Sequence, residues 1–202
     1  MSDQTISVRR SRRSRSLLAM LRDRRAVAAV EFALLLPLML TLFIGGNEIS
    51  QALAIYRKVG HTSSTLGDLV AQSPTLTKAD MTDILAASSS VMTPYSTTTV
   101  KMVIAAVKYT TAKGYKVCWS VSQNDTAWTM GSSPPITIPT GLVSDGEEVV
   151  VTRVQYSYTS PFSAIMKDIW GAGAINLSDL SYFRPRSAAY VTYDVYAVQN
   201  CT

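Results

Sequence analysis

The chain of 202 residues has few of the side chains that enzymes use for catalysis or metal binding. It has a single histidine, His61, and two cysteines, Cys118 and Cys201. Clusters of metal ligands, and pairs of a histidine with a serine or cysteine nucleophile, are therefore excluded for lack of partners. We expect His61 to be a surface residue. We also expect no enzymatic activity, no metal and no cofactor.

Two other patterns that sometimes mark an active site are incomplete in this chain. Glu147 and Glu148 are adjacent on a predicted strand, so their side chains point to opposite faces and cannot act on one bond. The Gly171-Ala172-Gly173 turn lacks the third glycine and the following helix of a dinucleotide-binding loop. We therefore interpret both patterns as structural.

One long hydrophobic run is present at residues 27–45, and Glu31 is its only charged residue. As a helix it would measure roughly 28 Å, about the hydrocarbon thickness of a bilayer. A core helix of a soluble protein would have a polar face, whereas this run is apolar all round except at Glu31. A cleaved secretory signal peptide is the closer alternative, but its apolar region is usually shorter and lacks a carboxylate. We therefore predict a single transmembrane helix over residues 26–46.

Charged residues make up only 16% of the chain, and they are unevenly distributed. Residues 1–25 hold eight arginines and two aspartates; of the 19 basic and 14 acidic residues in the whole chain, eleven and twelve remain for the rest. The rest therefore has no basic patch for a nucleic acid. Arg22, Arg24 and Arg25 lie beside the hydrophobic run, so the positive-inside rule predicts a basic cytoplasmic arm and an exported C-terminal part.

The arm and the run join in the motif Arg-Arg-Ala-Val-Ala-Ala-Val-Glu-Phe-Ala-Leu-Leu-Leu-Pro at residues 24–37. This motif resembles the N-terminal motif of TadE-like proteins, the minor pilins or pseudopilins of the bacterial Tad pilus system. The resemblance implies that a prepilin peptidase cleaves between Ala26 and Val27, which makes Glu31 the fifth residue of the mature chain. The family usually has glycine where Ala26 stands, and alanine is also small. Residues 177–186, which end in Arg-Pro-Arg, resemble the C-terminal signature of TadE-like proteins.

Glu31 and Phe32 are the residues to which the resemblance assigns a part in pilin assembly. A carboxylate in the hydrocarbon costs a few kcal/mol, so it is a functional hypothesis by default. Glu31 lies four residues after Val27 on the same helical face, where its charge can offset the ammonium that cleavage creates at Val27. The alternative is that Glu31 only reaches back to the cytoplasmic interface.

The function implied by the resemblance is that of a minor pilin in the assembly or initiation of a Tad (Flp-type) pilus. The protein would be anchored in the inner membrane, with a periplasmic C-terminal domain that can enter the pilus. Its implied partners are a prepilin peptidase, the major pilin, another minor pilin, the inner-membrane assembly platform and membrane lipid. The alternative is an uncleaved, membrane-anchored periplasmic binding or adhesion module.

The apolar pattern at residues 47–73 predicts an amphipathic helix that extends the transmembrane helix and ends before Pro74. Together they predict one long helix of the kind that pilin-like proteins use as a spine, bent at Pro37 or at Gly45-Gly46. The alternative is two helices joined by a glycine hinge. The predicted packing face consists of Ile49, Leu53, Tyr56, Val59, Leu66 and Val70.

Residues 74–202 predict the remainder of an α+β fold, a periplasmic domain with a small antiparallel sheet packed on the long helix. Thr77 and Asp80 predict a capped helix that ends near Ser90. Alternating patterns rich in β-branched residues predict strands, and the richest of them, at residues 147–157, is predicted to lie at the sheet centre. The other predicted elements are strands at residues 99–109, 115–121 and 190–198, a loop at 129–146, and a short helix or loop at 161–170.

Both cysteines lie in the part that we predict to be exported. In an oxidising periplasm Cys118 and Cys201 would readily form a disulfide, and closing a loop of about 80 residues would stabilise the fold by roughly 4 kcal/mol in the chain-entropy model. Such a bond would also tie down the C-terminal end of the chain. The alternative is two buried free thiols.

Overall fold

A single helix, α2 (Arg24–Gln72), runs through 49 residues without a break. The computed structural model describes residues 24–163, 167 and 174–194. The alternative of two helices joined at the glycines is therefore wrong. Pro37 lies inside the helix, and the Thr41 hydroxyl donates to the Pro37 carbonyl at 2.8 Å. The chain divides into two compact units, Met1–Ile49 and Ser50–Thr202, and α2 contributes to both.

A second helix, α3 (Lys78–Ser90), begins at the predicted capping box. The Asp80 N–H donates to the Thr77 hydroxyl oxygen at 3.2 Å, and the Thr77 N–H donates to the Asp80 carboxylate at 2.9 Å. This second hydrogen bond lowers the pKa of the Asp80 carboxyl. At the other end of α3, Lys58 of α2 donates to the carbonyls of Val91 and Thr93 at 3.1 and 2.7 Å. The lysine thus binds the carbonyl of Val91, the C-cap of α3, and that of Thr93 in the turn that follows.

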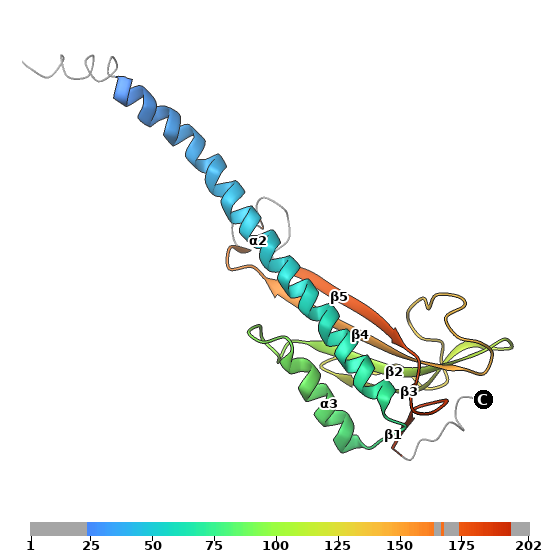
Figure 1. The fold of residues 1–202 in the computed structure, drawn as a ribbon. Helices are drawn as coiled ribbons and strands as arrows, with labels where there is room; N and C mark the ends of the chain where they lie inside the picture. The colour runs from blue at the N-terminus through green and yellow to red at the C-terminus, as the bar shows by residue number, and fades with distance from the viewer. Residues whose placement is uncertain (1–23, 164–166, 168–173, 195–202) are drawn as a thin grey trace, which may run out of the picture. The chain divides into compact units, whose positions relative to one another are not determined.

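Four antiparallel strands form the main sheet, in the order β3-β2-β4-β5 (Figure 1). The predicted strands at residues 99–109, 115–121 and 147–157 are confirmed, and β4 lies in the interior of the sheet beside β2. The edge strand β5 was missed. The bounds are β2 (Lys101–Thr110), β3 (Gly114–Gln123), β4 (Glu148–Thr159) and β5 (Ala174–Phe183).

A smaller parallel pair joins two short strands that are far apart in the sequence. β1 (Thr75–Leu76) pairs with β6 (Thr192–Tyr193). The final strand was predicted at residues 190–198, and only these two residues of it form a strand in the described part of the chain. Residues 195–198 lie outside the described residues, as does most of the short helix or loop predicted at 161–170.

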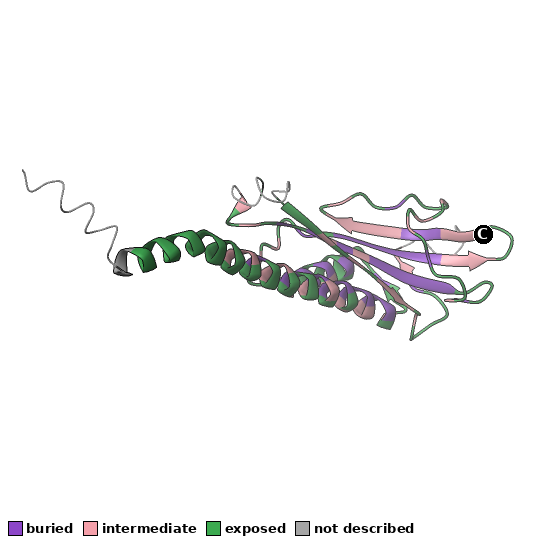
Figure 2. Cartoon of the chain, turned by 90° about the horizontal axis from the view of Figure 1, so that it is seen from above, coloured by how far each residue is buried: buried purple, intermediate pink, exposed green. Residues whose placement is uncertain are grey.

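Each face of the main sheet has its own apolar core (Figure 2). On the helix side, residues such as Ile104 and Val154 pack with α2 and α3. On the loop side, β2 and β4 pack with the irregular segment at residues 124–147. The loop predicted at 129–146 therefore also covers a sheet face. The residues that it buries against the sheet are Ile138 and Val143, and Trp128, just before the predicted loop, is buried with them.

The packing face of α2 differs from the prediction in its first turns. Val59, Leu66 and Val70 are buried as predicted, but Ile49, Leu53 and Tyr56 are 61%, 48% and 47% exposed. The prediction assumed that only apolar residues would be buried, whereas the observed face also includes hydroxyl residues that bond to the sheet. The residues that replace the predicted ones on this face are Ile55, Thr62 and Ser63.

Ser63 is the centre of this hydroxyl contact. Its hydroxyl lies 3.0 Å from that of Thr152 on β4 and donates to that of Ser181 on β5 at 3.0 Å. The Thr152 hydroxyl in turn donates to the Ser63 carbonyl at 3.0 Å. Because each of these hydroxyls has a partner, the hydrogen bonds offset the cost of removing them from water and hold α2 over the two strands.

Candidate functional site

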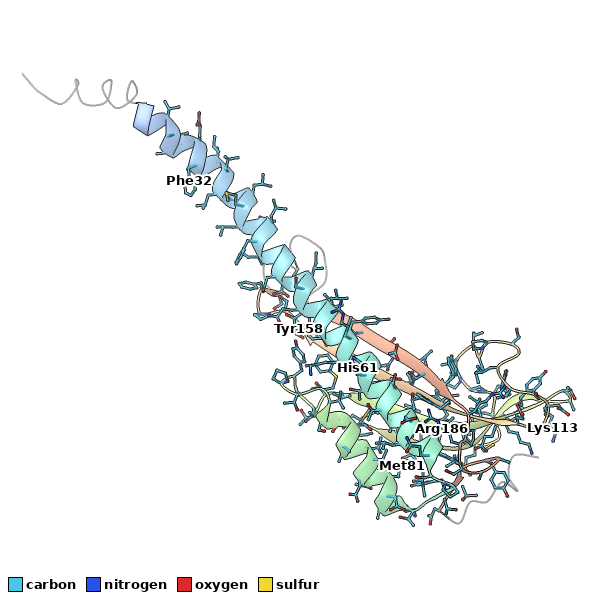
Figure 3. All side chains as sticks on the ribbon, viewed as in Figure 1. Phe32, His61, Met81, Lys113, Tyr158 and Arg186 are labelled. Atoms are coloured by element: carbon cyan, nitrogen blue, oxygen red, sulfur yellow. The ribbon has the colours of Figure 1, made fainter. Side chains whose placement is uncertain are left out.

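The N-terminal part of α2 is the candidate functional segment, because it carries the residues of the motif. From Val27 to Phe43 its large apolar side chains are exposed, with Val27 at 51% and Phe32 at 60% (Figure 3). Within the described residues this is the one helix long and apolar enough to cross a membrane, with a mean hydropathy of 2.4 over its best window, none of which is buried. A helix that is apolar and exposed on all sides is not a core helix of its own domain. We conclude that it is a membrane anchor.

Glu31 and Phe32 lie in this segment, and both are exposed. Glu31 follows Val27 by four residues in continuous helix, so the two lie on one face about 6 Å apart along the axis. This is the geometry that was predicted to bring the carboxylate near a new N-terminus at Val27. The pairing itself stays a prediction.

The predicted cleavage bond, between Ala26 and Val27, lies in α2, close to the start of the described part of the chain. Arg24 and Arg25 are part of α2, and Arg22, the third of the topology-setting arginines, lies outside the described residues. The cleavage itself stays a prediction.

Cys118, the first half of the predicted disulfide, is buried on β3 and is not a free thiol. It occupies a β-bulge: Ala106 pairs with Trp119 and Val107 pairs with Val117, which leaves Cys118 as the extra residue. The bulge lets Cys118 and Trp119 both contribute to the helix-side core. Cys201 lies outside the described residues, so its pairing with Cys118 stays a prediction.

Among the described residues, the remaining titratable groups do not come together as a catalytic centre would require. His61 is exposed on α2, as expected (Figure 3). In the described ranges, no three His, Cys, Asp or Glu residues are placed to hold a metal ion. Glu147 is half exposed and lies 3.8 Å from Arg184. Its neighbour Glu148 is buried, so the two carboxylates do not share a site.

Glu148 holds the segment that follows β5. Its Oε1 accepts a hydrogen bond from the Val191 N–H at 2.9 Å, and burial raises the pKa of this carboxyl to about 7, against the opposing effects of that hydrogen bond and of Lys108. The indole N–H of Trp119 donates to the Val191 carbonyl at 2.7 Å. Both backbone groups of Val191 are thus bound by buried side chains. Neither contact was anticipated from sequence, because both partners are more than 40 residues away along the chain.

The Arg-Pro-Arg motif at residues 184–186 fastens the same segment to the domain. Arg184 donates to the Leu142 carbonyl at 2.6 Å, and Arg186 forms an ion pair with Asp68 of α2 at 2.8 Å. The Arg186 N–H also donates to the Ala71 carbonyl at 2.8 Å. These contacts give the motif a structural role, which the resemblance did not specify.

An exposed apolar helix that can cross a membrane, followed without a break by the first helix of an α+β domain, defines a class of membrane-anchored proteins with one N-terminal span. Residues 26–65 match the family model for TadE-like proteins, so the TadE-like resemblance is confirmed over this segment. The match includes Ala26, Val27, Glu31 and Phe32 and ends within α2. No curated protein and no solved structure matches the chain.

Proposed function

We propose that this protein is a minor pilin that takes part in the assembly or initiation of a Tad pilus. The observation that carries the proposal is the TadE-like match over residues 26–65, on a helix whose apolar residues are exposed over the length of a membrane span. An exposed helix of this kind needs lipid before assembly and apolar helices of other subunits after it.

The first step of the proposed function is cleavage by a prepilin peptidase at the cytoplasmic side of the span. Cutting between Ala26 and Val27 removes the basic arm and creates an ammonium on Val27. When the subunit leaves the lipid for a bundle of helices, that charge enters an apolar environment, where an unpaired charge costs several kcal/mol. The Glu31 carboxylate of a neighbouring subunit offsets it and sets the axial register between the helices. The other proposed partners are the major pilin, another minor pilin and the inner-membrane platform.

The test is the mature N-terminus of the full-length protein, co-expressed with the prepilin peptidase of its host. Intact-mass analysis should show a chain that begins at Val27. Ala26→Gly should be cleaved at least as completely, and Ala26→Phe should remain intact, since a bulky side chain blocks a site that takes small residues. Ala33→Phe, the same change seven residues further along the span, is the matched control and should be cleaved normally.

A chain that still begins with the leader in the presence of the active peptidase would contradict the proposal. The protein would then be a permanently anchored module of the periplasm. Cleavage of Ala26→Phe at the wild-type rate would instead show that the cut is made elsewhere.

A further inference from the structure

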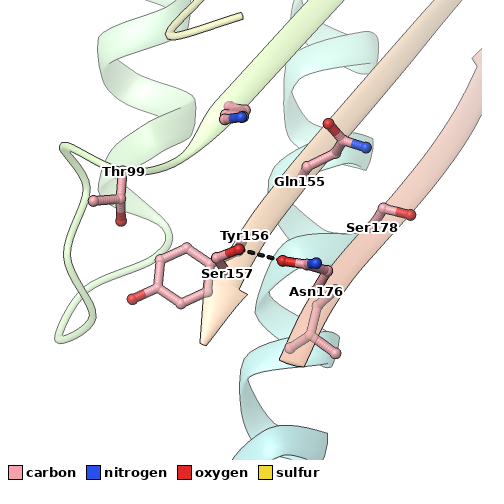
Figure 4. Close-up of a pocket in the computed structure, with 8 residues that line it drawn as sticks. Thr99, Gln155, Tyr156, Ser157, Asn176 and Ser178 are labelled. Carbon is pink, nitrogen blue, oxygen red and sulfur yellow. Dashed lines mark hydrogen bonds between the residues drawn. The ribbon is translucent and has the colours of Figure 1, made fainter. Parts of the chain in front are cut away.

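A polar groove lies on the loop side of the sheet, beyond the segment that covers the rest of that face. It has a volume of about 290 Å³ and is lined by side chains of β2, β4 and β5 (Figure 4). Lys101 pairs with Gln155, and Gln155 pairs with Ser178, so these three residues form one row across the strands. Ser157 and Asn176 form the next row. Paired residues of antiparallel strands point to the same side, so all five face the groove together.

Hydrogen-bond donors predominate in this groove. The Ser157 hydroxyl donates to the Asn176 side-chain carbonyl, which leaves the Asn176 amide N–H groups to face a ligand. In the described part of the chain, Lys101 and Gln155 have no side-chain hydrogen bond or ion pair, and no acidic side chain lines the groove. Arg153, which lies two residues before Gln155 on the same face of β4, is occupied by its ion pair with Asp125 at 3.1 Å.

Among the described residues that line the groove, Lys101 is the one free cation, and this limits the charge of the ligand. Lys101 offers one positive charge, which matches one carboxylate, whereas phosphate sites usually combine several donors of an arginine, a helix N-terminus or a backbone nest. The amides of Gln155 and Asn176 and the Ser178 hydroxyl suit a ligand that is rich in hydroxyl groups. The volume lies just below the usual range for small-molecule pockets.

We propose that this polar groove binds an acidic saccharide, with the sugar carboxylate on Lys101 and its hydroxyl groups on Gln155, Asn176 and Ser178. The site belongs to residues 99–178 and does not depend on cleavage or on the pilus assignment. A protein that failed the cleavage test would still have the groove, and a pilin without saccharide binding would remain a pilin.

The experiment uses the full-length protein in detergent micelles and isothermal titration with trigalacturonate, and with maltotriose as the neutral saccharide. Trigalacturonate should bind in the millimolar range or better, and maltotriose at least about tenfold more weakly. Lys101→Gln should weaken trigalacturonate binding about tenfold, because it removes the charge-assisted hydrogen bond. Lys113→Gln, which removes an exposed lysine in the β2–β3 turn (Figure 3), is the matched control and should bind as the wild type does.

Three results would overturn the proposal. The first is no heat of binding with trigalacturonate up to about 10 mM, a concentration beyond any specific saccharide site of this kind. The second is equal affinity for maltotriose, which would remove the acidic class of ligand. The third is equal weakening by Lys101→Gln and Lys113→Gln, which would show that the anion binds the general surface charge and not the groove.

Discussion

Gly67 of α2 lies directly against the ring of Phe183 on β5, so close that a Cβ at this position would collide with ring carbons. The contact allows the backbone of α2 to approach the edge strand β5. Ser63, one turn earlier on α2, is hydrogen-bonded to the same strand through Ser181. It also makes glycine the residue that the packing requires there, although glycine is a poor helix former.

Gly67→Ala should therefore destabilise the domain by about 1–3 kcal/mol, the usual cost of overpacking, despite the gain in helix propensity. Gly60→Ala on the same helix is the matched control, since its Cβ would meet only Asp179 at an ordinary 3.9 Å. The control should be neutral or more stable by up to about 1 kcal/mol. Urea unfolding followed by tryptophan fluorescence measures both. Equal stabilities for the two variants would mean that α2 moves away from Phe183 at no cost.

The raised pKa of Glu148 should make the stability of the folded domain depend on pH. Its pKa is about 7 in the folded protein and ordinarily 4.5, so between these values the folded state binds the proton more tightly than the unfolded state. Stability from this group is therefore present below pH 4.5 and is lost as the pH rises to about 7, by an amount on the order of 3 kcal/mol.

Glu148→Gln keeps an oxygen for the Val191 N–H and removes the titration. The fall in unfolding free energy between pH 5 and pH 8 should shrink in this variant, whereas Glu147→Gln, at the half-exposed neighbour, should keep the wild-type slope. Urea titrations of the full chain in micelles at several pH values provide the comparison. If all three proteins lose stability in parallel, Glu148 does not titrate in this range.

Local signals made part of this fold predictable. The Thr77–Asp80 capping box and the alternating pattern of β2 and β4 depend on residues close in sequence, and both were found as expected. β5 was missed because its apolar residues change face within the strand: Ile175 and Leu177 lie on one side, Leu180 and Tyr182 on the other. The strand therefore has no regular alternation of apolar and polar residues. An edge strand can lack this alternation because it is partly exposed on both faces.

The contacts that hold the C-terminal segment of the domain could not be predicted from the sequence, for a different reason. The bond from Val191 to Glu148 spans 43 residues, and the ion pair of Arg186 with Asp68 links the end of the domain to its first helix. Such pairs follow from the three-dimensional arrangement and leave no local pattern. The candidate segment at residues 26–32 was predictable because its motif is continuous. The polar groove was not, since its three strands meet only in the sheet.

Glu31→Gln tests the role of the carboxylate in assembly, because it keeps the shape and removes the charge. Insertion and cleavage should be largely normal, whereas co-assembly with pilus components and surface pili should be lost. Glu31→Asp retains the charge and should restore a measurable fraction of the pili. Immunoblots of sheared surface fractions and of membranes separate assembly from protein level. Wild-type numbers of pili in the Gln strain would leave Glu31 with only an interfacial role.

The Cys118–Cys201 disulfide predicts resistance to alkylation. Protein isolated without reductant should add no maleimide label until it is reduced, and then should add two. Cys201→Ser should lower the unfolding free energy by about 4 kcal/mol in the chain-entropy model. Cys118→Ser/Cys201→Ser, compared with each single variant, distinguishes loss of the bond from loss of buried volume at Cys118. Labelling of both thiols in the unreduced wild type would refute the bond.

The bulge at Cys118 has a consequence for how this strand tolerates change in length. Val117 and Trp119 are two residues apart on β3 and would face the same side in a regular strand. Because of the bulge, Val117 contributes to the loop-side core and Trp119 to the helix-side core. Deletion of this one residue would join Val117 to Trp119 in a regular ladder, in which both side chains keep their present faces. Deletion at another position of β3 would instead move part of the strand to the opposite face, so β3 should tolerate the loss of a residue best at the bulge.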